Sequence, residues 1–212
     1  VEFLPQRIFD RLVTKYNGNK SVKHFTCWNQ LLCMLFGQLS SRESLRDLIT
    51  VIEAHQSKSY HLGFGKNVTR NNLSKANENR NYKIFEDFAN HLILIAQEKN
   101  SNDSFEIKGT VYAFDSSTID LCLSVFWWAH FRKTKAGIKL HTLFDINTQI
   151  PVFIHITEAN VHDVNAMDVI KYEPFAYYIF DRAYVDYLRL YRITKSDAYF
   201  VVRAKSNVKF KR

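Results

Sequence analysis

The spacing of apolar residues changes near residue 100, and this change constrains the fold more than any other feature of the sequence. Before it, apolar residues recur at the three- and four-residue intervals of amphipathic helices. After it, short β-branched and aromatic runs alternate with polar residues or end in an acid, which is typical of strands. Asn100 to Asp103 forms a polar break between the two patterns. We therefore predict a small all-α domain over residues 1–102 and an α/β domain over 103–212.

The first part predicts a series of helices. Pro5 opens one that ends near Gly18, because proline is favoured in a first turn and glycine after a last turn. Thr26 is expected to cap a second, largely apolar helix. Ser40 and Glu43 have the spacing of a capping box in front of a third.

A short polar helix is predicted from Thr69 to Arg80. Arginine and asparagine side chains make bidentate contacts with guanine and adenine in the major groove. With a helix on either side, this segment would form a helix-turn-helix reader of DNA. The alternative is a polar surface helix without a partner. The candidate DNA-binding residues on this segment are Arg70, Asn72, Lys75 and Arg80.

The second part predicts five strands with two helices between the later ones. Three strands, a helix, a strand, a helix and a strand describe a mixed α/β domain. The expected strands cover 111–114, 137–145, 151–156, 177–180 and 198–202, and the expected helices cover 164–171 and 184–193.

Two acids stand out because each follows a predicted buried strand. Asp115 ends the run VYAFD, and Asp181 ends the run YYIFD. Carboxylates at the ends of adjacent strands can bind one divalent cation, and all-oxygen ligands suit Mg²⁺. The alternative for each is that the acid merely caps a loop or a helix.

Charge and cysteine content narrow the class of protein. The chain carries 29 Lys and Arg against 21 Asp and Glu, a net charge of +8, which favours nucleic acid or an anionic membrane surface as partner. Its three cysteines are an odd number without a CxxC pair, which excludes a disulfide framework and argues against a structural zinc site. No apolar run approaches the roughly 18 residues of a membrane span.

Several ordered motifs resemble those of IS4-type insertion-sequence transposases. They are AFDSSTI, AGIKLHTLFD, PVFIHITEANVHD and YYIFDRAYVDYLRLYRI, preceded by KHFTCWNQLLCMLFGQLSSRESLRDL and RNNLSKANENR. The resemblance covers nearly the whole chain. It implies an RNase H-like fold with a DDE triad of metal-binding acids, behind a helical DNA-binding region.

Carried over by position, the resemblance makes Asp115 the first catalytic acid and metal ligand and Asp181 the second. The third acid of the family is a Glu downstream of the fifth strand, and no residue of this chain matches it. Glu158 is rejected as a substitute, because its segment is not a triad position in the family.

The resemblance also implies the setting of the reaction. The cofactor is Mg²⁺, with Mn²⁺ as the alternative ion, and the chemistry is two-metal phosphoryl transfer. The partners are double-stranded DNA at the transposon ends and the target, bound by a homodimer in the bacterial cytoplasm at the nucleoid, without a membrane.

Further basic residues are candidates for DNA contact near the two acids. Each has an alternative role without DNA. Arg132, Lys133, Lys135 and Lys139 could form the solvated rim of a hairpin, His162 could lie at a helix cap, and Arg182 could form an ion pair with Asp181. These candidates are Arg132, Lys133, Lys135, Lys139, His162 and Arg182. Trp127 and Trp128 are expected in packing contacts.

Two other classes of function stay open. A chain without the third acid could bind transposon ends and inhibit an intact transposase, or it could be a remnant without a role. A nuclease that hydrolyses DNA without strand transfer would share the fold and the metal site.

Overall fold

The computed structural model describes residues 3–59, 61, 63–65, 68–99, 109–121, 130–132 and 135–204. The chain forms two compact units, Val1–Leu92 and Ile93–Arg212. The predicted boundary between residues 102 and 103 lies outside the described residues and stays a prediction.

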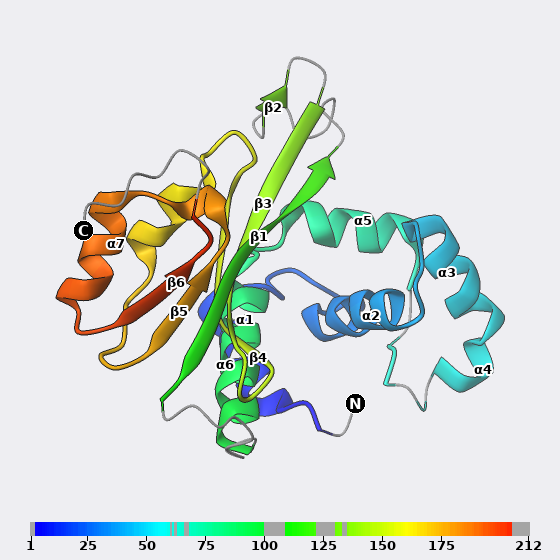
Figure 1. Ribbon diagram of the computed structural model, residues 1–212. Helices are drawn as coiled ribbons and strands as arrows, with labels where there is room; N and C mark the ends of the chain where they lie inside the picture. Colours follow the sequence, from blue (N-terminus) through cyan, green and yellow to red (C-terminus); the bar gives the residue numbers. More distant parts are fainter. Residues whose placement is uncertain are drawn as a thin grey trace, which may run out of the picture. The chain divides into compact units, whose positions relative to one another are not determined.

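Unit 1 is built from helices, as the sequence predicts. The helices are α1 (Gln6–Lys15), α2 (Cys27–Leu39), α3 (Leu45–Ala54), α4 (Gln56–Ser59), α5 (Arg70–Asn79) and α6 (Lys83–Lys99), which continues past residue 92 (Figure 1). The predicted cap of α2 is confirmed, since the hydroxyl of Thr26 accepts a hydrogen bond from the amide of Asn29. Thr69, predicted as the start of the polar helix, is the cap of α5, and its hydroxyl accepts a hydrogen bond from the amide of Asn72.

The predicted capping box is wrong. Helix α3 begins at Leu45, and its cap is Ser44, whose hydroxyl accepts a hydrogen bond from the amide of Asp47 at 3.1 Å. The hydroxyl of Ser40 instead donates to the carbonyl of Phe36 at 2.6 Å, so it belongs to the end of α2.

Aromatic packing holds the first helices together. Phe9 is fully buried, and its ring meets those of Trp28 and Phe88 edge-on, with centroids 5.4 Å and 5.0 Å away. Gly18 lies against α2 and α6, since a Cβ there would approach Cδ1 of Ile84 to 2.5 Å. The predicted helix end near Gly18 therefore reflects packing space as well as helix termination.

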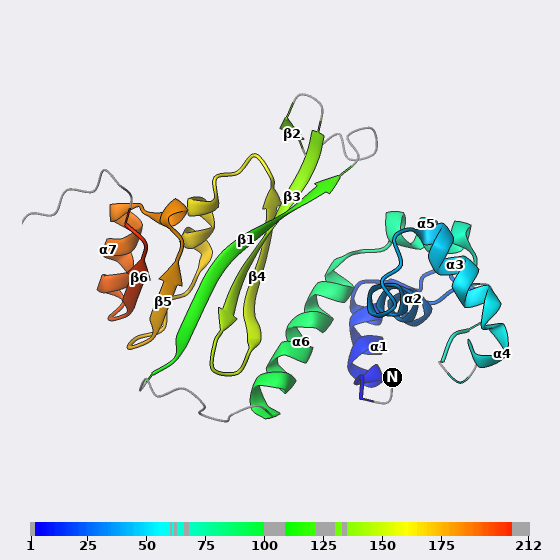
Figure 2. The same ribbon diagram turned by 45° about the vertical axis from the view of Figure 1, so that its right-hand side comes forward.

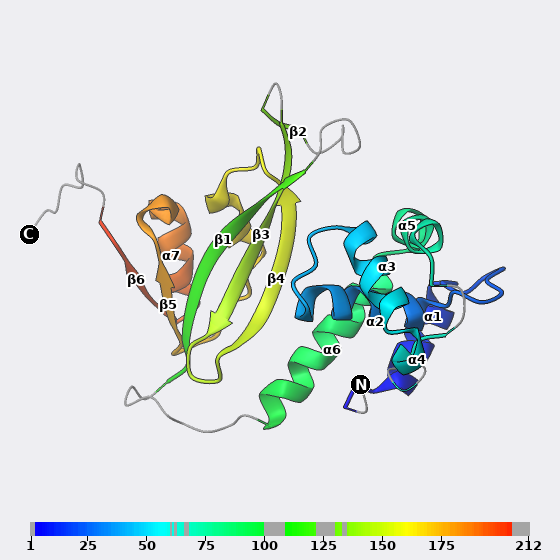
Figure 3. The same cartoon turned by 90° about the vertical axis from the view of Figure 1, so that its right-hand side faces the viewer.

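Unit 2 is a mixed sheet with helices. Its strands are β1 (Val111–Leu121), β2 (His130–Arg132), β3 (Lys135–Asp145), β4 (Ile150–Glu158), β5 (Tyr177–Phe180) and β6 (Tyr199–Val202). Figures 2 and 3 show β1, β3 and β4 as long, twisted neighbours. The described part of the unit also contains the 3₁₀ helices η1 (Asp163–Val169) and η2 (Arg182–Tyr184) and the α-helix α7 (Tyr187–Lys195).

The strand order gives this unit an RNase H-like fold, which confirms the predicted fold class. Strand β3 pairs antiparallel with both β4 and β1, and β1 then pairs in parallel with β5, which pairs in parallel with β6. The core lies between the sheet and the helical segments, where residues of β1, β5, η1, η2 and α7 form one buried cluster.

Three local predictions for unit 2 are wrong. Strand β1 does not end before Asp115 but continues to Leu121, because β3 pairs with it residue for residue as far as Ala136. The helix predicted over 164–171 is the 3₁₀ helix η1, which spans Asp163–Val169. The last predicted helix begins later than expected, since η2 precedes α7.

Candidate active site

Strand register brings Asp115 and Asp181 next to each other. Phe114 of β1 pairs with Phe180 of β5 in a parallel ladder, and each is followed directly by one of the two aspartates. Neighbouring strands lie about 4.8 Å apart. Both phenylalanines are buried, with ring centroids 6.0 Å apart, whereas both aspartates are exposed. Two exposed aspartates therefore directly follow two buried, packed phenylalanines, which form an aromatic floor on adjacent strands.

Tyr184 completes that floor and lies within electrostatic reach of the acids. Its ring packs edge-on against Phe114 with centroids 5.3 Å apart, and the side chain is almost fully buried. Burial raises the pKa of Tyr184 to about 12, and the charges of Asp163, Asp115 and Asp181 act in the same direction. The negative charges of carboxylates on three separate segments therefore act on the pKa of this buried hydroxyl.

A polar network fixes the backbone directly after Asp115. The amide of Ser116 donates to Asp115 Oδ1 at 2.8 Å, and its hydroxyl donates to Asp163 Oδ1 at 2.9 Å. Lys139 Nζ lies 3.1 Å from the same Asp163 oxygen and donates to the carbonyl of Val161 at 2.7 Å. Burial opposes ionisation of Asp163, but the hydrogen bonds from Lys139 and Ser116 hold its pKa below the usual range.

His141 supports this network from inside the sheet. It is the register partner of Ser116 on β3 and is fully buried. Its Nε2 atom lies 2.9 Å from Oγ1 of Thr157, while Nδ1 has no hydrogen-bond partner among the described residues. Burial lowers the pKa of His141, although the charge of Asp163 opposes the shift.

The other predicted DNA-binding residues of unit 2 differ in how exposed their side chains are. His162 is exposed and precedes η1, and Arg182 is exposed and begins η2 directly after Asp181. Lys139 is mostly covered by its pairing with Asp163. Three further cations, Arg132, Lys133 and Lys135, have side chains outside the described part of the chain, as do Trp127 and Trp128.

The candidates on α5 divide into two groups. Arg70 and Lys75 are exposed, and Asn72 is half-buried. Arg80 turns inward instead: its guanidinium donates to the carbonyls of Phe25 and Thr26, the latter at 2.9 Å. Burial lowers the pKa of Arg80. A role for these four residues in DNA binding stays a prediction, and Arg80 has a clear structural role beside it.

The donor set fits a hard divalent cation. Asp115 and Asp181 offer exposed carboxylate oxygens from adjacent strands, and Mg²⁺ is commonly held by one or two carboxylates with water completing its shell. Among the described residues, no group of three or more His, Cys, Asp or Glu side chains forms a closed metal site. The geometry therefore matches an open, water-accessible site.

Comparison with protein families identifies the second unit. A family model described as "Transposase DDE domain" matches residues 106–212, half of the chain. The chain belongs to the DDE transposase family. A second model, "Domain of unknown function (DUF4372)", matches residues 1–65. Members of the DDE family typically use divalent metal ions, which agrees with the two-carboxylate edge.

One relative and one solved structure are similar to the chain. The chain is 32% identical over 139 residues to the Sinorhizobium fredii (strain NBRC 101917 / NGR234) protein named "Putative transposase y4zB", a match that covers 66% of the chain and 38% of that relative. A cryo-EM structure of a piggyBac transposase synaptic complex with hairpin DNA is 11% identical, with a TM-score of 0.49, and covers 98% of the chain against 50% of its own length. The chain thus spans well under two thirds of either protein.

Sequence reasoning missed some residues of the site. The sequence predicts Tyr184 only as the start of a helix, yet its hydroxyl is a buried group that senses all three acids. A signal was available, since Tyr184 follows Asp181 by three residues and thus lies one turn further on.

Within the described residues, no helix has the length and apolar character to cross a membrane.

Proposed function

We propose that the chain is the end-binding and two-aspartate part of an IS4-type insertion-sequence transposase, which cuts DNA at transposon ends and transfers the strands to a target. The observation that carries the proposal is the parallel register of Phe114 with Phe180, which sets Asp115 beside Asp181. Membership of the DDE family supports the same class of reaction.

Asp115 and Asp181 would hold the catalytic ion, Mg²⁺ in the cell and Mn²⁺ as its substitute. Such an ion polarises a phosphoryl oxygen and lowers the pKa of bound water, so no covalent protein nucleophile is required. The protein's own contribution is placement. The bonds from Ser116 to Asp115 and to Asp163 fix the first carboxylate on its strand, and rigid placement is what metal ligands require.

Contacts with DNA would come from both units. On α5 the exposed Arg70 and Lys75 and the half-buried Asn72 are proposed to face transposon ends. In unit 2 the phosphates beside the cleaved bond would be held by basic residues, namely Arg132, Lys133, Lys135, Lys139, His162 and Arg182. We place the working protein as a homodimer on DNA in the bacterial cytoplasm, at the nucleoid.

Binding of Mn²⁺, followed by electron paramagnetic resonance, tests the metal site in the 212-residue chain. We expect Asp115→Asn and Asp181→Asn each to weaken Mn²⁺ binding by roughly tenfold or more, because each removes one of the anionic ligands. Asp10→Asn is the matched control, since Asp10 is an exposed acid on α1. Equal Mn²⁺ affinity in the wild type and both site variants would refute the assignment.

A second candidate is a binding-only protein, which would occupy transposon ends without cutting them. Nicking of a plasmid that carries the transposon ends separates the two functions. Nicking that requires Mg²⁺ and is abolished in Asp115→Asn supports the transposase reaction. Tight end binding without nicking, together with unaltered Mn²⁺ binding in that variant, supports the binding-only protein.

A further inference from the structure

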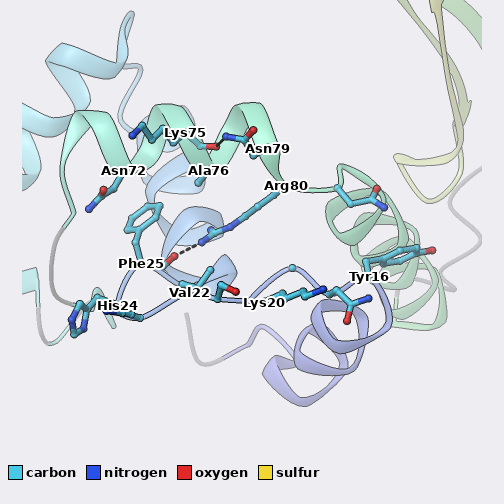
Figure 4. A pocket seen from close by; sticks show the side chains of 15 residues that line it. Tyr16, Lys20, Val22, His24, Phe25, Asn72, Lys75, Ala76, Asn79 and Arg80 are labelled. Carbon is cyan, nitrogen blue, oxygen red and sulfur yellow. Dashed lines mark hydrogen bonds between the residues drawn. The ribbon is translucent and has the colours of Figure 1, made fainter.

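Unit 1 carries an open cleft of about 610 Å³ between the segment 16–25 and α5 (Figure 4). None of its 15 lining residues is an Asp or a Glu. The cations among them are Lys20 and Lys23 on one side and Lys75 and Arg80 on the other, and His24 lies beside them. A cleft of one charge sign concentrates ligands of the opposite sign.

The segment on the first side of the cleft has a fixed shape. The side chain of Asn19 accepts a hydrogen bond from the amide of Cys27 at 2.8 Å, which ties the segment to the start of α2. Asn17 and Ser21 adopt left-handed backbone conformations, with φ of 54° and 61°. Gly18 between them packs too closely for any side chain. The lysines on this segment therefore start from a preorganised backbone.

Arg80 braces the cleft from the second side. Figure 4 shows its side chain extending from the end of α5 to the carbonyl of Phe25. The same guanidinium donates to Oε1 of Gln30 at 2.9 Å and lies over the ring of Phe25. Because its donors bind the protein itself, Arg80 holds the two walls together, and its charge is partly covered.

Three cations remain for a ligand. Lys20, Lys23 and Lys75 are exposed, and none forms an ion pair with a described residue. Lysine binds phosphate as a mobile point charge, and contacts with phosphate position a protein on DNA without reading its base sequence. The asparagines around the cleft add neutral donors at the same surface, and they are Asn17, Asn72, Asn79 and Asn81.

We infer that this cleft binds the phosphodiester backbone of duplex DNA, with Lys20, Lys23 and Lys75 as the phosphate contacts and Arg80 as a brace. The inference rests on the proposed function, which gives the chain DNA as its partner. It adds the segment 16–25 to the DNA interface. It also assigns the cleft, including Lys75 of α5, to binding that does not depend on base sequence.

Fluorescence anisotropy with a short labelled duplex of mixed sequence tests the cleft, using the 212-residue chain at a series of salt concentrations. For the triple variant Lys20→Ala, Lys23→Ala, Lys75→Ala we expect weaker binding to every duplex sequence. We also expect a shallower dependence of log K on log salt, by about 0.9 for each lysine that no longer meets a phosphate. Circular dichroism melting shows whether the variant is folded, and these exposed side chains are not part of the core.

The matched control replaces three exposed lysines away from the cleft, Lys58, Lys83 and Lys171, with alanine. Both triple variants lower the net charge from +8 to +5, because each has three fewer cations. A change in salt slope confined to the cleft variant supports the inference. Equal slopes in the two variants overturn it while leaving DNA binding intact. Failure of the wild type to bind any duplex overturns DNA as the partner, and the Mn²⁺ measurement then still tests the metal site.

Discussion

The hydroxyl of Ser116 donates a hydrogen bond to Asp163 at 2.9 Å, and this bond joins strand β1 to the start of η1, which follows β4. The two residues are 47 positions apart in the chain. Lys139 reaches the same carboxylate from β3. Three segments therefore meet at Asp163, which is hydrogen-bonded to the residue that follows Asp115, the proposed first metal ligand.

Asp163→Asn should destabilise the protein by about 1–3 kcal/mol, because Lys139 loses its anionic partner and Ser116 loses a charged acceptor. A double-mutant cycle with Ser116→Ala, measured by urea unfolding, isolates the bond between them. We expect a coupling free energy of about 0.5–1.5 kcal/mol. Additive effects of the two changes would show that the bond contributes nothing.

The lowered pKa of Asp163 also predicts a pH dependence of stability. A carboxyl whose pKa is lower in the folded state stabilises the fold fully above its unfolded value, taken as 3.8, and this contribution disappears as pH falls toward the folded value. Unfolding free energy should therefore decrease below about pH 4 more steeply in the wild type than in Asp163→Asn. Parallel curves for the two proteins over that range would contradict the role of this carboxylate.

Arg80→Ala should lower the stability of unit 1 by about 2–4 kcal/mol, because it leaves the carbonyls of Phe25 and Thr26 without their donor inside a partly buried contact. Thermal unfolding followed by circular dichroism measures the loss. Arg70→Ala, on the exposed face of the same helix, should change stability by less than about 0.5 kcal/mol. If Arg80→Ala melts like the wild type but binds DNA less tightly, Arg80 is a DNA contact and not a brace.

Gly18→Ala should cost about 1–3 kcal/mol, because the added methyl group would lie 2.5 Å from Cδ1 of Ile84 and 2.7 Å from Sγ of Cys27. Gly37→Ala is the comparison: its Cβ would meet only the flexible end of Leu48, at 3.3 Å, and alanine favours the helix. Urea unfolding should therefore rank Gly37→Ala as the more stable variant. The reverse order would show that the segment after α1 can shift to make room.

The arrangement of the second unit could be predicted because each of its strands has a local pattern of apolar residues that identifies it. The runs that end at Asp115 and Asp181 indicate buried strands, and two acids after such strands point to one shared edge. The length of β1 could not be predicted in this way. Its second half is polar, and it is held in the sheet by pairing with β3, a contact between distant parts of the chain.

The direction of individual side chains was the other feature that the sequence could not predict. Arg70 and Arg80 look alike in the sequence of a polar helix, yet one is exposed and the other binds carbonyls of the preceding segment. The cap of α3 shows the same limit, since Ser40 and Ser44 both precede a helical pattern and only backbone geometry selects Ser44. Tertiary contacts decide such cases, and they leave no local pattern to read.

The parallel pairing of β1 with β5 also determines when, during folding, the two aspartates become neighbours. Asp115 and Asp181 are 66 positions apart, and they become neighbours only through a ladder between distant segments. Such long-range pairs form late in folding, because the chain loses conformational entropy on closing the loop before the new contacts stabilise it. While the ribosome is still synthesising the residues before β5, the nascent chain has one aspartate without its companion. Under the proposed function, the pair of carboxylates that would hold the ion is therefore assembled only once the sheet has folded.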